Sequence, residues 1–276
     1  MDLYDRMAQQ SSRRLTNGYS TSFRLAARLL APNIRQAIYD IYGLVRLADE
    51  VVDTYGGADA AKLLDALETD VYAAIKRGYS TNMIVHAFAK TARTYHIDST
   101  LLEPFFGSMQ MDAPGAVYTP ADYHAYIHGS AEVVGLMCLR VFCRGDAVQY
   151  RQLQAGAAAL GAAFQKTNFL RDLADDHHTL GRFYFPDGSF EQFDDAAKSA
   201  VTTDIQHDFA QAEQAMRALP RSARLAVTTA ARLYQALLGK LAATPATVIR
   251  QRRVRIPNAR KVLIALTATL GGLVRG

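Results

Sequence analysis

Hydrophobic and polar positions repeat with a helical period along almost the whole chain. Apolar residues recur three and four positions apart, whereas the strict alternation of a half-buried strand is scarce. The pattern therefore predicts an all-α protein. The expected helices cover residues 3–17, 22–29, 33–54, 58–77, 81–95, 99–112, 120–143, 147–177, 190–218, 220–242 and 258–273.

Proline and glycine interrupt this pattern at most of the helix boundaries. None of the breaks is long or polar enough to be a domain linker, and no internal repeat or low-complexity tract is visible. We therefore expect residues 1–276 to form a single helical domain. The breaks fall at Pro32, Pro220 and Pro245 and in segments 55–57, 113–120 and 180–190.

Composition and charge narrow the class of protein. Half of the 276 residues are hydrophobic and 21% are charged, which is ordinary for a globular chain with a substantial core. The formal net charge of +5 is compatible with nucleic acid, acidic lipid or phosphorylated substrates. The first residues lack an apolar signal-peptide core and no 18-residue uncharged apolar run occurs, so a cytoplasmic location is expected. Cys138 and Cys143 are expected to be buried free thiols.

Two of the expected helices carry a pair of aspartates four residues apart. In the first helix, Asp49 and Asp53 share a face with Tyr42 and Arg46, within a sector of roughly 60°. Solvated helix faces rarely combine paired acids with an aligned tyrosine and arginine amid apolar neighbours. This face is therefore a candidate binding site.

The second pair, Asp172 and Asp176, shares a stripe of roughly 80° with Gln165 and Asn168. The two acidic helices are far apart in the sequence, so they would have to face each other across the centre of the domain. Four carboxylates would then surround one cavity.

Paired carboxylates on one helix face repel each other by about 0.2–0.5 kcal/mol. A hard cation is the natural compensation. Mg²⁺ prefers oxygen ligands and binds through one or two carboxylates together with substrate phosphates. Asn168 and Gln165 add neutral oxygens. A solvated face is the usual meaning of a single pair, but two such pairs indicate metal and diphosphate chemistry.

Five sequence motifs follow one another between Tyr19 and Lys261. They read YSTSFRLAARLL, IYGLVRLADEVVD, YIHGSAEVVG, FQKTNFLRDLADD and GRFYFP. With these motifs the chain resembles the squalene and phytoene synthase family, whose members join two isoprenoid diphosphates head to head. The resemblance implies an all-α isoprenoid synthase fold, a helical bundle around a deep central cavity.

The resemblance also implies a set of site residues. The four aspartates and Asn168 would hold Mg²⁺, for which Mn²⁺ could substitute, and the metal would bridge to the diphosphates. The metal and Arg46 would neutralise the leaving diphosphate, so that an allylic cation can form in a cavity that is apolar below its charged rim. Residues matched to substrate binding are Ser20, Ser22, Tyr42, Arg46, Gln165, Asn168, Arg182 and Tyr184.

The helix at 120–143 is suited to the cavity wall. One of its faces carries Tyr126, Gly129, Ser130, Val133 and Met137, and small residues would let a prenyl chain approach the backbone. Ordinary helix packing explains the same small residues equally well. The Tyr126 ring or hydroxyl would face a cationic intermediate. Glu132, where many family members have glycine, falls outside this face.

The leading prediction is a Mg²⁺-dependent prenyltransferase of carotenoid biosynthesis. It would condense two geranylgeranyl diphosphates through a cyclopropyl diphosphate into phytoene. The alternative is the same chemistry on farnesyl diphosphate, giving dehydrosqualene, squalene or hydroxysqualene. No Gly-rich dinucleotide fingerprint is present, which favours a reaction without NADPH. A family member of another class, a non-catalytic assembly or lipid-binding factor, would be expected to have lost the acidic ligands.

Segment 250–261 concentrates six basic residues. A nucleic-acid binder could use them, but the acidic stripes would then remain unexplained, so no nucleic acid is expected. The apolar tail that follows is too short to span a bilayer. We predict a core-packing helix there, with peripheral membrane contact as the weaker interpretation. Glu50, Asp112 and Asp175 are expected to be supporting or surface acids.

Overall fold

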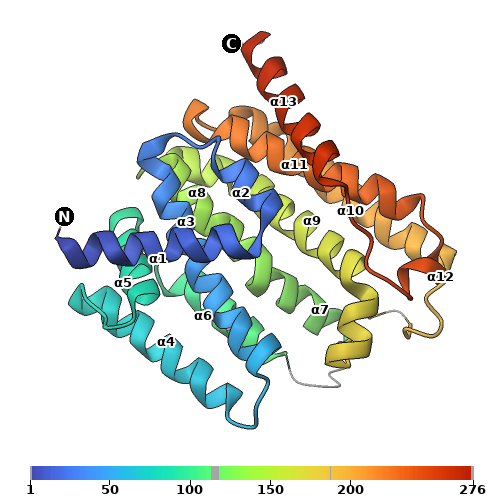
Figure 1. The fold of residues 1–276 in the computed structure, drawn as a ribbon, viewed down its shortest axis with the longest axis horizontal. Coiled ribbons are helices and arrows are strands. Elements are labelled where there is room, and N and C mark those ends of the chain that lie inside the picture. The colour runs from blue at the N-terminus through green and yellow to red at the C-terminus, as the bar shows by residue number, and fades with distance from the viewer. Residues whose placement is uncertain (1, 113–117, 187, 275–276) are drawn as a thin grey trace.

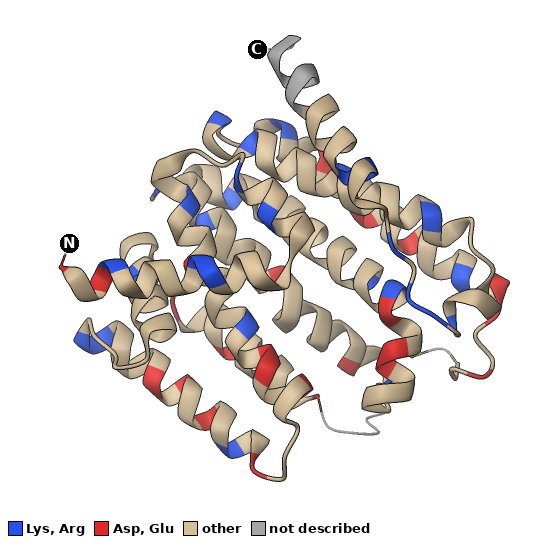
Figure 2. Ribbon diagram, in the orientation of Figure 1, with Lys and Arg blue, Asp and Glu red and all other residues tan. Residues whose placement is uncertain are grey.

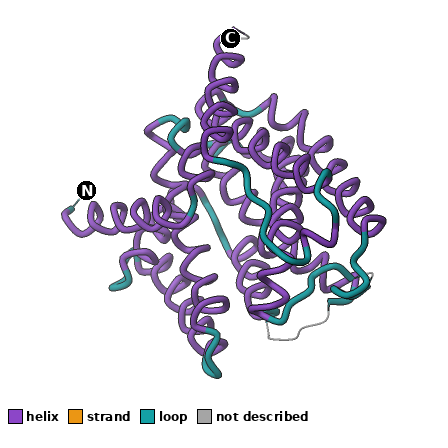
Figure 3. The backbone as a smooth tube through the Cα atoms, turned by 45° about the vertical axis from the view of Figure 1, so that its right-hand side comes forward, coloured by secondary structure: helices purple, strands orange, loops and turns teal. Residues whose placement is uncertain are grey.

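The computed structural model describes residues 2–112, 118–186 and 188–274, with side chains described as far as residue 268. Its regular elements within these ranges are helices (Figure 1; Figure 3), so the all-α prediction is confirmed. In chain order they are α1 (Leu3–Tyr19), α2 (Thr21–Ala27), α3 (Pro32–Asp49), η1 (Glu50–Tyr55), α4 (Ala60–Arg77), α5 (Met83–Tyr95), α6 (Ser99–Gln110), α7 (Pro120–Ile127), η2 (His128–Glu132), α8 (Val133–Cys143), α9 (Ala147–Leu180), α10 (Asp195–Ala218), α11 (Arg221–Ala242), α12 (Ala246–Ile249) and α13 (Asn258–Val274).

Two of the predicted long helices contain a π-helical turn. Segments 33–54 and 120–143 each read as one α-helix in the sequence pattern, but they contain η1 and η2. In a π-helical turn the N–H bonds to a carbonyl five residues back, as the N–H of Gly56 does with Val51 at 3.2 Å. The extra residue rotates every side chain that follows it. The faces predicted from a regular helical period are therefore shifted at these two places.

The remaining differences lie at helix ends. Residues 190–194, predicted to open a helix, are not helical, and α10 begins after Asp194, whose carboxylate accepts a hydrogen bond from the Ala197 N–H at 2.9 Å. The short α12 was not predicted. The predicted break at 113–120 lies partly outside the described residues, because segment 113–117 is not described.

The long helix α9 runs through the middle of the fold and packs against α10, α8, η2 and α11. It begins after Asp146, whose side chain accepts hydrogen bonds from the N–H groups of Val148 and Gln149 at 3.0 and 2.9 Å. It ends at Gly181, whose φ of 67° favours glycine. The N–H of Arg182 then donates to the Asp176 carbonyl at 3.0 Å, so the chain turns back beside the second acidic pair.

Glycines let α9 approach η2 and α8 closely. A Cβ added at Gly161 would lie 2.5 Å from the Ala131 carbonyl oxygen, and one at Gly135 would lie 2.8 Å from the Ala157 carbonyl oxygen. Such distances are too short for any side chain. The crossing is therefore backbone against backbone.

The apolar interior extends to both sides of this crossing. One cluster surrounds the buried Phe88, Phe105 and Phe106, and an aromatic cluster lies beneath the acidic end of α9. By length and composition alone, Pro120–Cys143 could cross a membrane. It packs here against α6 and α9, and Val133 is fully buried, so this segment is an interior element of the fold.

Candidate active site

The first acidic segment ends α3 and continues into η1. The Arg46 guanidinium is paired with Glu50 and lies 3.8 Å from Asp49. Its Cζ atom also stands 4.2 Å from the ring centroid of Tyr19, within the range of a cation–π contact. The Arg46 Nε atom is buried and has no hydrogen-bond partner within the part of the chain that the structure describes. An anion bound here would satisfy that donor.

Arg182 connects the two acidic segments. Its Nη1 atom donates to Asp53 Oδ1 at 2.7 Å, and its Nη2 atom donates to the carbonyls of Asp112 and Val52 at 2.9 and 3.2 Å. The side chain is only 3% exposed. The sequence alone did not predict this bridge, although the resemblance assigned Arg182 to the site.

The second acidic segment lies on the last turns of α9. Asp172 accepts from Arg171 Nε at 2.8 Å, and Arg253 Nε lies 2.7 Å from the same oxygen, Oδ1. The Asn168 Oδ1 atom, one turn earlier, is buried without a partner among the described residues. An amide oxygen in this position suits a cation.

Electrostatic coupling shows that the two segments face each other. Burial, together with the neighbouring charges of Asp53 and Asp112, raises the pKa of Asp49 to about 7. Burial also raises the pKa of Asp176 to about 7, together with the charges of Asp172 and, again, Asp53. The charge of Asp53 raises the pKa of both Asp49 and Asp176, so carboxylates from the two acidic segments lie in one site.

The donor set fits Mg²⁺. It consists of carboxylate oxygens from two helices and the unpartnered amide oxygen of Asn168. No three or more His, Cys, Asp or Glu side chains among the described residues are grouped so that they could hold a metal ion. Mg²⁺ usually takes one or two carboxylates and completes its shell with water and substrate phosphate.

Asp112 is the site residue that the sequence analysis underrated. Its carboxylate is 3% exposed and accepts from the Tyr126 hydroxyl at 2.8 Å and from the Tyr118 and Tyr184 hydroxyls at 3.4 Å. Burial raises its pKa to about 6, which the charge of Arg182 opposes. As the last acid of a predicted helix it gave no signal of this role, since its partners come from distant segments.

A basic rim faces the second acidic segment. Arg171 and Arg253 bind Asp172, and Lys261 Nζ donates to Thr21 Oγ1 at 3.1 Å. Burial and the charges of Arg171, Arg255 and Arg253 lower the pKa of Lys261, which shows that these cations are gathered together. The sequence showed the basic run but not that it reaches the acidic pair.

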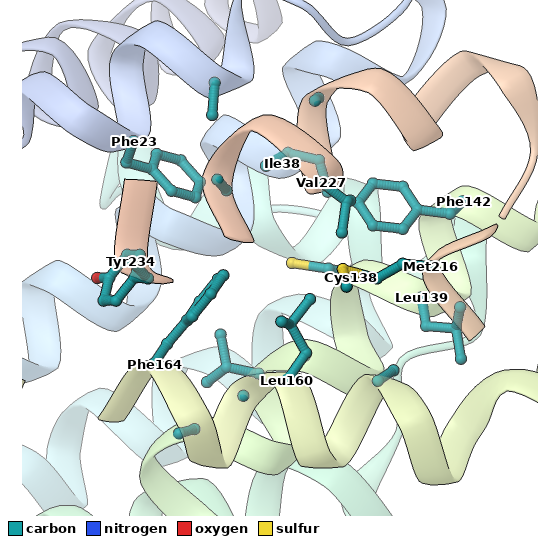
Figure 4. A pocket seen from close by; sticks show the side chains of 18 of the residues that line it. Phe23, Ile38, Cys138, Leu139, Phe142, Leu160, Phe164, Met216, Val227 and Tyr234 are labelled. Carbon is teal, nitrogen blue, oxygen red and sulfur yellow. The ribbon is translucent and has the colours of Figure 1, made fainter. Parts of the chain in front are cut away.

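An apolar cavity of about 270 Å³ lies between α2, α3, α8, α9, α10 and α11 (Figure 4). Gln165, two turns before Asp172 on α9, is one of its few polar lining residues. The cavity therefore comes within two turns of the second acidic pair along α9, and most of its lining is apolar. Its largest apolar side chains include Phe23, Phe142, Leu160, Phe164, Met216 and Tyr234.

The predicted cavity wall needs correction. Of its five residues only Ser130 lines the cavity, and the other lining positions of this segment include Ala131, Val134, Gly135 and Cys138. The π-helical turn η2 rotates the face. Residues absent from the lining are Tyr126, Gly129, Val133 and Met137.

These four residues serve packing or positioning instead. Tyr126 donates to Asp112, and a Cβ at Gly129 would lie 2.1 Å from the Pro104 carbonyl of α6. Val133 and Met137 are buried in the core cluster around Phe106. For Gly129, Val133 and Met137 the packing interpretation is the one that the structure supports.

The other predicted residues occupy distinct places. Ser20 caps α2 through its hydroxyl, which accepts from the Phe23 N–H at 3.1 Å, whereas Ser22 lines the cavity. Tyr42 stacks on Phe23 with ring centroids 4.7 Å apart, and Tyr184 stacks on Phe169 at 4.1 Å. Glu132 pairs with His128, with His128 Nδ1 and Glu132 Oε2 2.8 Å apart, and does not line the cavity.

Paired carboxylates, guanidinium groups and a nearby apolar cavity are the features expected of an all-α enzyme that binds diphosphate esters of hydrocarbon chains. The chain belongs to the squalene/phytoene synthase family, whose model matches residues 16–260. The family prediction is thereby confirmed, and members of this family are prenyltransferases.

Relatives and solved structures agree with this assignment. The chain is 31% identical to a 15-cis-phytoene synthase of Synechocystis, over 95% of this chain and 85% of that protein. It is 28% identical to a 15-cis-phytoene synthase of Synechococcus elongatus, over 97% of this chain and 94% of that protein. Its fold is similar to that of a dehydrosqualene synthase, with a TM-score of 0.80, 18% identity and 96% of both chains covered. A squalene synthase from Alicyclobacillus acidocaldarius gives a TM-score of 0.75 with 21% identity, over 87% of this chain and 95% of that one.

Proposed function

We propose that this protein condenses two geranylgeranyl diphosphates head to head into phytoene and releases diphosphate, a step of carotenoid biosynthesis. The observation that carries the proposal is the meeting of two aspartate pairs and Arg182 above an apolar cavity. The choice of phytoene is supported by near-full-length similarity to two 15-cis-phytoene synthases. The whole chain would act as one helical domain.

The residues that would hold Mg²⁺ are Asp49, Asp53, Asp172, Asp176 and Asn168. When bound, the metal would neutralise the diphosphate leaving groups. The proposal rests on oxygen donors alone, so Mn²⁺ would also suit the site.

The diphosphates would be held by donors that are already in place. The buried Nε atoms of Arg46 and Arg182 have no partner among the described residues, and each would donate to a phosphate oxygen. Arg171, Arg253 and Lys261 would supply further positive charge along the rim. As negative charge develops on the leaving diphosphate, these cations stabilise it without reorganising.

The hydrocarbon chains would lie in the apolar cavity. Ser22, Ser130 and Gln165 provide the few polar groups of its lining, and the rest is aliphatic or aromatic. Such a lining excludes water from the carbocation until the second prenyl group attacks it. The proposed reaction consumes no NADPH.

Tyr126 and Asp112 would position Arg182 rather than touch the substrate. Tyr126 donates to Asp112, and Arg182 Nη1 lies 3.5 Å from an Asp112 carboxylate oxygen. This chain of contacts orients the guanidinium between Asp53 and the diphosphate. A cytoplasmic protein making a hydrocarbon would deliver it to a membrane, so we also infer peripheral membrane contact.

Product analysis tests the proposal. Purified protein is incubated with geranylgeranyl diphosphate or farnesyl diphosphate and Mg²⁺, with and without NADPH, and hydrocarbons and released diphosphate are identified. Phytoene formed without NADPH is the expected result. Dehydrosqualene or squalene formed from farnesyl diphosphate alone would replace the substrate assignment. No hydrocarbon and no diphosphate release from either substrate would overturn the enzyme proposal.

A further inference from the structure

We propose that the outward face of α13, with the basic segment before it, docks on the surface of an anionic phospholipid bilayer. The proposal specifies which surface makes the membrane contact inferred above. It rests on the proposed function only in giving that contact a role in product release. The docking itself follows from the helix face, the charge distribution and the position of α13 over the cavity.

The helix α13 is apolar on two opposite faces. One face, which includes the buried Ala265 and Ala268, packs on the rest of the protein. On the other face, the side chains of Val262 and Leu263 are 50% and 60% exposed. Successive exposed apolar residues on a helix whose opposite side is already packed indicate a second apolar environment.

The charge of the chain is strongly divided along the sequence. After Glu213, residues 214–276 contain twelve of the 31 Lys and Arg residues and none of the 26 Asp and Glu residues. The part of the chain before them is therefore net negative, although the whole chain carries +5. The helices α11 and α13 therefore carry Lys and Arg but no Asp or Glu in their sequence, and Figure 2 shows blue on both.

Exposed cations lie on the first turn of α13 and in the segment before it. Arg252, Arg255 and Arg260 are exposed, and Arg260 lies one turn before Leu263 on α13. Exposed arginines beside exposed aliphatic side chains form the amphipathic pattern of helices that lie in a membrane interface. Basic residues are attracted to anionic headgroups while the apolar residues enter the acyl boundary.

The helix α13 also lies over the wall of the cavity. It packs on α11 and α2, and it extends beyond the body of the protein at the top of Figure 1. Both of these helices line the cavity, α2 through Phe23 and Ala26 and α11 through Leu233 and Tyr234. Docking through α13 would therefore bring this wall beside the bilayer, where a hydrocarbon product could leave without crossing water.

Charge distinguishes the bilayer from other occupants of this face. A second copy of the chain docking through the same face would bring two strongly positive surfaces together, which repel each other. Nucleic acid would match the charge but not the adjoining valine and leucine. An anionic lipid surface matches both.

A single tryptophan tests the docking, because the chain contains none. Leu263→Trp places the reporter on α13, and Leu63→Trp, at a position 43% exposed on α4, is the matched control. Both variants are mixed with vesicles of phosphatidylglycerol and phosphatidylcholine in equal parts, and with vesicles of phosphatidylcholine alone. We expect a blue shift and quenching by brominated acyl chains for Leu263→Trp on the anionic vesicles, and neither for Leu63→Trp.

Other results would overturn the proposal. An unchanged Leu263→Trp spectrum would exclude docking through α13, and equal shifts of both reporters would show unspecific adsorption. A blue shift that grows with protein concentration without vesicles would show self-association. The assay contains no prenyl substrate, so it can fail while phytoene synthesis stands, and the reverse also holds.

A charge variant provides an independent measurement. Arg252→Gln with Arg260→Gln should weaken binding to the anionic vesicles by at least about tenfold, because each basic residue near the surface contributes attraction. Arg144→Gln with Arg151→Gln, two exposed positions elsewhere, should leave binding unchanged. Equal losses in both pairs would assign binding to net charge alone and overturn the assignment to α13.

Discussion

Arg182 donates to Asp53 at 2.7 Å and so ties the first acidic segment to the end of the second. Its other guanidinium nitrogen, Nη2, donates to two backbone carbonyls, of Val52 and Asp112. The guanidinium is planar and can serve three acceptors at once from a fixed position, whereas an ammonium group offers a single charge. Arg182 therefore sets the relative position of the two aspartate pairs.

Replacing Arg182 with lysine should reduce turnover by at least about a hundredfold, because the charge remains but the bridge is lost. Helix content by circular dichroism should be retained. Arg217→Lys, at a side chain 77% exposed and paired with Glu213, is the control and should behave like the wild type. Turnover of Arg182→Lys within a fewfold of the wild type would show that the bridge is dispensable.

Mutagenesis can distinguish an aspartate of the proposed site from an ordinary acid on an exposed helix face. We expect Asp49→Asn to lower turnover by at least about a hundredfold, since the site loses a carboxylate that no other residue replaces. Its melting temperature should stay at or above that of the wild type, because burial and the Asp53 charge already disfavour the ionised Asp49. Asp175→Asn, at a side chain 55% exposed, is the control, with activity near the wild type. Comparable losses in both variants would remove the special role of Asp49.

The crossing of α9 with η2 gives a stability prediction. Gly161→Ala would place a Cβ 2.5 Å from the Ala131 carbonyl oxygen, so the helices must move apart, and we expect a loss of about 1–3 kcal/mol in the free energy of unfolding. Gly239→Ala on α11 meets nothing within 4 Å and should instead gain up to about 1 kcal/mol. Urea unfolding of both variants measures the difference. Equal stability would mean that the crossing tolerates separation.

Local pattern was sufficient for the parts of this protein that depend on helical period. The apolar spacing predicted most of the helices, and the i, i+4 spacing placed Asp172 and Asp176 on one face of α9, whereas Asp53 lies in the π-helical turn η1 that follows Asp49. It could not reveal the π-helical turn η2, because the segment that follows, VVGLMCLRVFC, is apolar on almost every face and so shows no change of phase. That turn is why Ser130 lines the cavity while Val133 and Met137 do not.

Tertiary contacts explain the rest of what the sequence did not show. Asp112 becomes central only because Tyr126, Tyr184 and Arg182 reach it from other segments. Arg253 acquires its role by lying 2.7 Å from Asp172 on a helix far earlier in the chain. Neither contact follows from spacing, so neither residue could be distinguished from a surface charge before the fold was known.

Asp40 provides a pH test outside the proposed site. This carboxyl group is 2% exposed and its neighbours are neutral: Gln36 donates to it at 2.8 Å, Thr91 donates at 2.8 Å, and the Ser12 hydroxyl lies beside it. Burial raises its pKa from 3.8 to about 6, despite these hydrogen bonds. The folded state therefore binds its proton more tightly than the unfolded state does.

The sign of the pH dependence follows from this raised pKa. Between pH 3.8 and about 6 the folded state holds more protons at Asp40 than the unfolded state, so stability falls as the pH rises through this window. Above it the ionised carboxylate costs up to about 3 kcal/mol, and below it the cost disappears. Asp40→Asn stays neutral and can keep its hydrogen bonds, and all other groups titrate alike in both proteins. Urea unfolding should therefore show Asp40→Asn gaining about 1–3 kcal/mol relative to the wild type between pH 4 and pH 7.5, whereas a pH-independent difference would mean that Asp40 titrates normally in the folded protein.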